Sequence, residues 1–218
     1  MDYLSLIKGS LLLLTNPNDV DPVYDIEAGL LTSRAMDLAV VHARTNPAIA
    51  AMMDERYNPP LPTLETLLQY PPGSLGYCYA RYLTDMGFAA DFYRETPIAD
   101  DATYLLMRMR KTHDIWHLVT GFGTDVVGEI TLKAFEFAQT RRPLAIVLIT
   151  GSLLKALVQA PESLNHILTQ LCRAYQLGQR CQPLLAQRWE TAWEKPLHEW
   201  QRELGVDANA AIAQLVSD

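Results

Sequence analysis

The sequence predicts an all-α protein, a single-domain helical bundle of about eight helices. Apolar residues recur at spacings of three and four along most of the chain, and no segment alternates convincingly between apolar and polar residues. N-cap residues, glycines and prolines bound the periodic segments. The chain has 218 residues, 49% of them hydrophobic, so it can bury one sizeable core.

Helical periodicity begins near the start of the chain. Asn–Pro pairs at 16–17 and 46–47 interrupt it, because proline ends or restarts a helix. Thr63 and Ser74 have side chains that favour N-caps, and Gly87 is the expected end of the helix that follows Ser74. The helices expected in this half of the chain cover residues 3–15, 23–44, 48–55, 64–70 and 74–86.

The helical pattern continues in the second half of the chain. The segment 143–159 is the most hydrophobic, and it predicts a central buried helix or, alternatively, a helix that lines a lipid tunnel or rests at a membrane interface. Trp189, Trp193 and Trp200 fall on one stripe of a final helix, which indicates a packing seam or a dimer seam. The expected helices cover residues 99–120, 125–140, 143–159, 161–178 and 183–205.

Four residues of metal-ligating types lie close together near the middle of the chain. His113, Asp114 and His117 fall within five positions, and Glu129 follows a glycine-containing turn. On a helix of about 100° per residue, both imidazoles and the Asp114 carboxylate share about one third of the circumference. Helices joined by a short turn are antiparallel neighbours, so Glu129 can face back toward His117.

Two histidines and two carboxylates without a thiolate favour a mixed N/O metal site over a structural Cys₄ zinc site. We therefore predict a divalent metal cofactor, with zinc first and iron, manganese or magnesium as alternatives. The apolar stripe of the helix continues into the two histidines, which places them on its inward face. Buried imidazoles and carboxylates need partners, and a metal would supply them.

Each of the four residues also has an ordinary structural interpretation. An i,i+4 histidine pair can be a hydrogen-bonded feature of a core, and Asp114 can be a solvated side chain. Glu129 can pair with Lys133, since Glu before Lys at i,i+4 is a favourable surface pair. His42 lies alone on its helix and is interpreted as structural.

Four segments carry a resemblance to a known family. The first is His-Asp-x-x-His, eleven residues and then Glu; the others are PPGSLGYCYARY at 71–82, GEITLKAFEFAQTRRP at 128–143 and WEKPLHEWQRELGV at 193–206. Together with Asp100–Asp101 before the motif helix, they resemble the Coq4-like family of coenzyme Q (ubiquinone) biosynthesis proteins, over about residues 25–206. Relatives usually carry Arg-Glu where this chain has Tyr77–Cys78.

The resemblance implies a role in quinone biosynthesis, on a polyprenylated hydroxybenzoate-type ring. It further implies a lyase-type reaction, oxidative decarboxylation with hydroxylation at ring carbon 1. A non-enzymatic scaffold that binds prenyl lipid and has a structural metal site is the alternative. A phosphohydrolase of the His-Asp type is disfavoured, because that chemistry needs further histidine and aspartate residues in a different order. The candidate lipid-binding residues are Tyr79, Arg81 and Tyr82 in the family-like segment, and Leu148 and Gly151 on the hydrophobic helix.

Composition limits the partners of this protein. A net charge of −7 argues against nucleic-acid binding. Expected partners are a polyprenyl lipid or prenylated quinone precursor, a quinone-biosynthesis enzyme complex, a membrane surface contacted peripherally, and a second copy in a homodimer. The N-terminus has the features of neither a transit peptide nor a signal peptide, which indicates a bacterial-type, cytoplasmic or membrane-associated protein with reduced cysteines at 78, 172 and 181.

Overall fold

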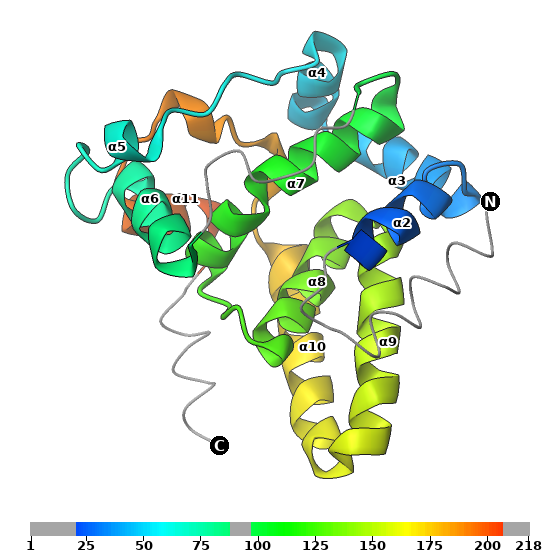
Figure 1. Ribbon diagram of the computed structural model, residues 1–218. Coiled ribbons are helices and arrows are strands. Elements are labelled where there is room, and N and C mark those ends of the chain that lie inside the picture. The colour runs from blue at the N-terminus through cyan, green and yellow to red at the C-terminus, as the bar shows by residue number, and fades with distance from the viewer. Residues whose placement is uncertain (1–20, 88–96, 207–218) are drawn as a thin grey trace. The chain divides into compact units, whose positions relative to one another are not determined.

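The computed structural model describes residues 21–87 and 97–206, and these residues form helices and no β-strand (Figure 1). The predicted all-α class is confirmed. The predicted helix over 3–15 lies outside the described residues. The α-helices are α2 (Asp21–Leu30), α3 (Arg34–Arg44), α4 (Pro47–Glu55), α5 (Leu64–Leu67), α6 (Leu75–Met86), α7 (Asp101–Thr120), α8 (Val126–Thr140), α9 (Pro143–Gln159), α10 (Leu164–Arg180) and α11 (Leu197–Leu204), with short 3₁₀ helices η1 (Pro161–Ser163), η2 (Leu184–Ala186) and η3 (Trp189–Thr191).

The chain divides into two compact units, each built from two separate stretches of sequence. Of the described residues, the first unit comprises 21–50 and 124–179, and the second comprises 51–87, 97–123 and 180–206. The single-domain organisation stays a prediction.

In the first unit, α9 packs against α2, α3 and α8. Ile26, Leu30 and Leu144 form a buried apolar cluster. This unit also contains a buried ionic network. In it the Arg142 guanidinium donates to Glu27 and to Glu136, at 2.9 Å in each case. Such a network needs all its charges paired, because an isolated buried charge is costly.

In the second unit, α7 packs against α6, α11 and η2. Its buried side chains include polar groups as well as apolar ones, and Arg108 is fully buried. The backbone N–H of Gly76 donates to the Trp193 carbonyl at 2.8 Å, and that of Leu75 donates to the Lys195 carbonyl at 2.9 Å. The segment that precedes α11 is thereby tied to the start of α6.

Two predicted helices are wrong in their extent. The helix expected over 23–44 is broken, because α2 ends at Leu30 and Ser33 starts α3 by accepting the Met36 N–H at 3.2 Å. The helix expected over 183–205 is reduced to η2, η3 and α11. Pro183 and Pro196 have no N–H for a helix, and the intervening carbonyls accept hydrogen bonds from the start of α6 instead.

The predicted tryptophan stripe is wrong as a helical feature, since the three residues do not lie on one helix. All three side chains are nevertheless buried in the second unit. The rings of Trp189 and Trp200 lie 4.7 Å apart, and Trp193 stacks on Tyr79 at 5.7 Å. The packing interpretation therefore describes their role in this unit, and the dimer interpretation stays a prediction.

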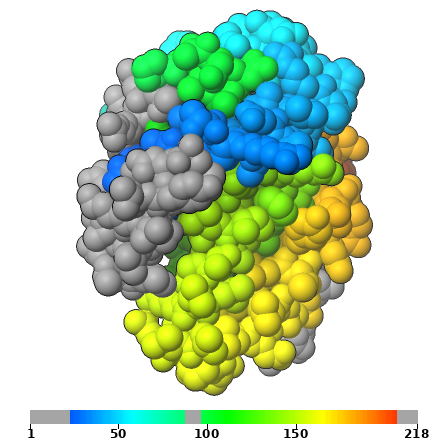
Figure 2. Space-filling view, turned by 90° about the vertical axis from the view of Figure 1, so that its right-hand side faces the viewer, coloured from blue at the N-terminus to red at the C-terminus, as the bar shows by residue number. Residues whose placement is uncertain are grey.

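The most hydrophobic helix, α9, has the predicted bounds, but it is not fully buried. Only Leu144 and Ala145 on α9 are buried, whereas Leu154 is 53% and Val158 81% exposed. Figure 2 shows the surface that α9 (lime green) and α10 (yellow) present. The expectation of a central buried helix is therefore wrong for the second half of α9. Among the described helices, none is long and apolar enough to cross a bilayer.

Candidate metal centre

Helix α7 carries both histidines of the predicted site, and its two ends are set by local sequence. The Asp100 side chain accepts the Thr103 N–H at 2.8 Å, and the Thr103 hydroxyl oxygen accepts the Asp100 N–H at 2.9 Å. This reciprocal capping box satisfies donors that the helix start leaves free. At the other end, Gly121 adopts φ +73°, which glycine allows at low cost. The helix therefore stops one turn after His117.

Within α7, the imidazoles of His113 and His117 meet through their Nε2 atoms, which are 3.3 Å apart. The rings are almost perpendicular, at 83°, with centroids separated by 4.8 Å. His117 is 2% exposed and His113 is half-buried. The i,i+4 spacing thus gives the predicted convergence of the two rings on one point.

The backbone after α7 fixes which nitrogen of His117 carries the proton. His117 Nδ1 lies 2.9 Å from the carbonyl oxygen of Phe122. A carbonyl can only accept, so Nδ1 is the donor, and in the neutral ring Nε2 presents a lone pair. That lone pair points toward His113. A backbone carbonyl on the outer nitrogen is also the arrangement that orients metal-binding histidines.

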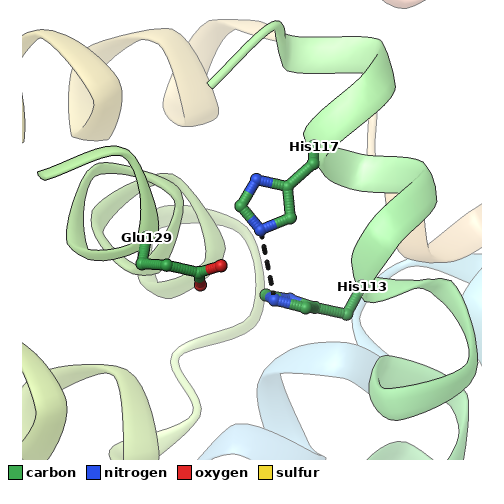
Figure 3. A group of neighbouring side chains, drawn as sticks. All are labelled: His113, His117 and Glu129. Carbon is green, nitrogen blue, oxygen red and sulfur yellow. Dashed lines mark hydrogen bonds between the residues drawn. The ribbon is translucent and has the colours of Figure 1, made fainter. Parts of the chain in front are cut away.

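Glu129 lies in the first turn of α8, which starts after Asp125 accepts the N–H groups of Val127 and Gly128. The candidate ligand atoms of His113, His117 and Glu129 lie within 4.8 Å of one another (Figure 3). Asp114, which is 6% exposed, is not part of this group. Metal binding by the four predicted ligands, Asp114 included, stays a prediction.

The alternative prediction for Glu129 is a surface ion pair with Lys133, but Lys133 has a different partner. Lys133 donates to Glu136 instead, at 2.8 Å, and Glu136 also accepts from Arg142. Lys133 thus belongs to the buried ionic network of the first unit. A surface Glu129–Lys133 pair is not what holds this part of α8.

Helix α6 contributes aromatic side chains beside the histidines. The Tyr82 ring stacks on His117 with centroids 6.4 Å apart and planes 23° from parallel. Burial, and then the negative charge of Asp114, raise the pKa of Tyr79, so its phenol stays protonated. The interpretation of Asp114 as a solvated residue is wrong, because its side chain lies buried near this phenol.

Comparison with known proteins gives the family. The family model for "Coenzyme Q (ubiquinone) biosynthesis protein Coq4" matches residues 30–209, which is most of the chain. This chain belongs to the Coq4 family. The matched range agrees with the range of about residues 25–206 over which the sequence motifs resemble that family.

Individual relatives support the same conclusion. Mitochondrial ubiquinone biosynthesis proteins from Rattus norvegicus and Aspergillus terreus are 33% and 36% identical to this chain, over 75% and 68% of it. The chain spans only 62% and 50% of the lengths of those two relatives. A crystal structure from Nostoc punctiforme PCC 73102, provisionally assigned to ubiquinone biosynthesis, superposes with a TM-score of 0.83 at 32% identity, covering 94% of this chain and 99% of that one.

In this Coq4-family chain, the distance between the two histidine nitrogens can be compared with that in a zinc site. Two imidazoles bound to one tetrahedral zinc, with Zn–N bonds of about 2.0–2.1 Å, have nitrogens about 3.3–3.4 Å apart. The observed Nε2–Nε2 distance is 3.3 Å. The spacing and the His117 tautomer therefore fit a shared cation. They equally fit a direct hydrogen bond from His113 to His117, so metal binding stays a prediction.

The candidate lipid-binding residues have different environments. Tyr79 is buried, Tyr82 is half-buried, and exposed Arg81 lies 3.4 Å from Asp85 in an exposed ion pair. On α9, Leu148 packs against the cluster formed by α2 and the start of α9. A Cβ added at Gly151 would meet no atom within 4 Å, so there is open space beside it. Lipid binding by these residues stays a prediction.

Tyr77 and Cys78, where the sequence is expected to depart from the family motif, lie on α6. Burial raises the pKa of the Cys78 thiol, and burial raises that of Cys181 to about 11. Both thiols are therefore protonated near neutral pH, and neither is an activated nucleophile. Cys78, Cys172 and Cys181 are free.

Sequence reasoning missed two interactions next to the site. Arg108, which is on α7 with the histidines, forms a buried two-pronged pair with Glu190, at 2.5 and 3.1 Å. Gln201 of α11 donates to carbonyls in the last turn of α7. The arginine could have been found from its position on the apolar side of α7. No local signal marks its partner 82 residues away, because long-range pairing is decided by the tertiary fold.

Proposed function

We propose that this chain acts in ubiquinone biosynthesis as a metal-dependent protein, on a polyprenylated hydroxybenzoate-type ring. Membership of the Coq4 family supports the pathway. The convergence of His113 and His117 on one point, with Glu129 in the same group, is the observation that carries the metal. Two imidazole nitrogens and one carboxylate are a donor set that zinc accepts, as do iron and manganese, whereas magnesium prefers oxygen donors.

The number of protein ligands decides whether a bound metal keeps an open position for a substrate. Catalytic zinc sites typically have three protein ligands and one open position, whereas four protein ligands close a tetrahedral site. Asp114 lies outside the group. We therefore propose that His113, His117 and Glu129 would hold the metal and that the substrate would take the remaining position.

The proposed reaction is oxidative decarboxylation at ring carbon 1. The ring carboxyl group leaves as CO₂, a hydroxyl whose oxygen comes from water takes its place, and dioxygen accepts the two electrons and two protons released and becomes hydrogen peroxide. A bound metal would supply a Lewis acid for the carboxylate or phenolate of the ring and, if redox-active, a place for dioxygen. The protein's own part is to hold the His117 ring with the Phe122 carbonyl and to place the Tyr82 ring against it.

Metal analysis and activity together test this proposal. The wild-type chain should bind one divalent metal and convert a prenylated 4-hydroxybenzoate to CO₂ and the hydroxylated ring. His117→Ala should lose both properties, while His166→Ala, an exposed histidine on α10, should keep them. Retained full activity in His117→Ala would remove the metal from the mechanism.

A second function, a non-enzymatic scaffold that binds prenyl lipid, is favoured by the exposed apolar residues of α9. Ile146, Leu154, Leu157 and Val158 are all exposed, although the helix is almost uncharged. Apolar side chains gathered on one helix are a common feature of lipid or membrane contact. The scaffold would copurify with lipid and bind metal, yet show no turnover. Turnover in the assay above therefore separates the two functions.

The remaining partners are part of the same proposal. A polyprenyl lipid or prenylated quinone precursor would be the ligand, and other enzymes of quinone biosynthesis would form a complex around it. A homodimer and a peripheral membrane contact are proposed with them. Light scattering and vesicle sedimentation of the wild-type chain measure the last two directly.

A further inference from the structure

The C-terminal helix α11 contributes one side chain to the end of α7, where His117 lies. Gln201 Nε2 donates to the Val119 carbonyl at 3.1 Å and to the Leu118 carbonyl at 3.5 Å. These two acceptors lie directly between His117 and the turn at Gly121. The contact joins residues more than 80 positions apart, and both lie in the second unit.

The last turn of a helix has carbonyls without partners in the helix itself. In α7, the Gly121 N–H donates to the His117 carbonyl at 2.8 Å, and Gln201 covers the next two carbonyls. Side-chain donors near a helix C-terminus stabilise its last turn. Gln201 therefore fixes the path of the backbone from His117 to the glycine that ends α7.

That path determines the hydrogen bond that orients the His117 ring. Phe122, whose carbonyl receives His117 Nδ1–H at 2.9 Å, is the first residue after Gly121. A change in the last turn of α7 would move this carbonyl relative to the ring. The position of His117 Nε2, the nitrogen facing His113, therefore depends on a turn that Gln201 holds.

Gln201 is itself held by a well-packed helix. Its neighbour Trp200 is buried against Trp189, and Leu204 is buried one turn later. The Gln201 carbonyl accepts the Val206 N–H at 2.8 Å where α11 ends. The amide is thus presented to α7 from a fixed backbone, which is what a positioning residue requires.

We propose that Gln201 is a positioning residue for the metal centre, acting through the last turn of α7 on His117. The inference rests on the proposed function, because it assumes that His117 binds a metal. Loss of a residue that orients a metal ligand typically weakens metal binding by about 10–100-fold. Helix α11 is then part of the site, although it contributes no ligand.

The test compares three substitutions in the full chain by titrating each with Zn²⁺ against a competing chelator. Gln201→Ala removes the donor and should weaken binding by about 10-fold or more. Gln201→Glu places a carboxylate against two carbonyls and should weaken binding further. Gln201→Lys restores a donor, and a cation at a helix C-terminus is favourable, so it should recover much of the affinity.

A matched control and a second measurement separate positioning from simple stability. Gln187→Ala removes a different side-chain hydrogen bond, in which Gln187 Nε2 donates to the Pro183 carbonyl at 3.0 Å. This substitution should leave zinc affinity unchanged. The melting temperature of each metal-free variant reports stability alone. Unchanged zinc affinity in Gln201→Ala, with or without a lower melting temperature, would overturn the inference. A wild-type chain that binds no metal would overturn the proposed function first.

Discussion

Helices α7 and α9 differ in a way opposite to what their composition predicts. Helix α7 has a mixed sequence, yet it buries Arg108, Thr112, Asp114 and His117. Helix α9 is the most hydrophobic helix, yet only Leu144 and Ala145 on it are buried. The polar helix is therefore the better buried of the two.

The comparison shows that hydrophobicity alone does not decide which side chains of these two helices are buried. Polar side chains of α7 are buried where they have hydrogen-bonding partners. Three buried polar residues of α7 have specific acceptors: Arg108 donates to Glu190, Thr112 donates to the Arg108 carbonyl, and His117 donates to the Phe122 carbonyl. A paired polar group can be buried at modest net cost. Apolar side chains on α9 need no hydrogen-bonding partner, and most of them stay partly or fully exposed although the helix is the most apolar one described.

The largest effect is expected from removing a polar partner of α7. Arg108→Ala would leave Glu190 buried and unpaired, and breaking a buried pair in this way costs about 3–5 kcal/mol. Arg81→Ala breaks the exposed pair with Asp85 and should cost less than about 1 kcal/mol. Urea unfolding of both variants measures the two free energies. Equal losses would show that burial does not set the value of the ion pair.

A second prediction compares two leucines on α9. Leu144→Ala should cost about 2–5 kcal/mol, since that side chain is buried in the cluster with Ile26 and Leu30. Leu154→Ala should change the free energy of unfolding by no more than about 0.5 kcal/mol, because Leu154 is exposed. The same denaturation series measures both. If Leu154→Ala destabilises the chain as much as Leu144→Ala, the second half of α9 is covered in solution.

Two glycines provide the third prediction. A Cβ at Gly178 of α10 would lie 2.7 Å from the Phe135 carbonyl oxygen, so Gly178→Ala should cost about 1–3 kcal/mol. A Cβ at Gly151 of α9 meets nothing, and alanine suits a helix interior better than glycine by about 0.5–1 kcal/mol. Gly151→Ala should therefore raise the melting temperature while Gly178→Ala lowers it. A fall in both would mean that Gly151 faces a neighbour.

The smallest effect concerns His42 of α3, which is not part of the metal centre. Burial, followed by the charge of Arg141, lowers the pKa of His42 below its usual 6.5. Between the lowered pKa and 6.5 the unfolded chain binds more protons than the folded one, so stability falls as pH falls through that range. Melting curves of the metal-free chain across this range should show that loss, and His42→Gln should reduce it.

Much of the fold could be predicted from local sequence because its determinants are local. Helices α6 and α7 begin after Ser74 and Asp100, whose side chains cap the first turn. They end at Gly87 and Gly121, which adopt the left-handed conformation that glycine allows. The convergence of His113 and His117 also follows from helical spacing alone. The break before Ser33 was missed, because a serine within an apolar periodic segment does not by itself end a helix.

The C-terminal region could not be predicted in the same way. Its tryptophans fit a helical stripe, but backbone pairing with Leu75 and Gly76 and two prolines prevent a continuous helix. Sequence spacing predicts Asp114 as a ligand because it shares a helix face with His117. Its burial near Tyr79 is decided by how α6 packs on α7, and sequence spacing contains no information on that packing.

The sequence alone determined the helical class, the ends of the motif helix and the histidine pair, because each depends on residues within one or two turns of one another. Only the tertiary structure decided that Glu190 pairs with Arg108, that Gln201 holds the last turn of α7, and that the most apolar helix is exposed along its second half. These features join residues far apart in the chain or depend on what covers a surface. Their energies arise only when the chain has folded.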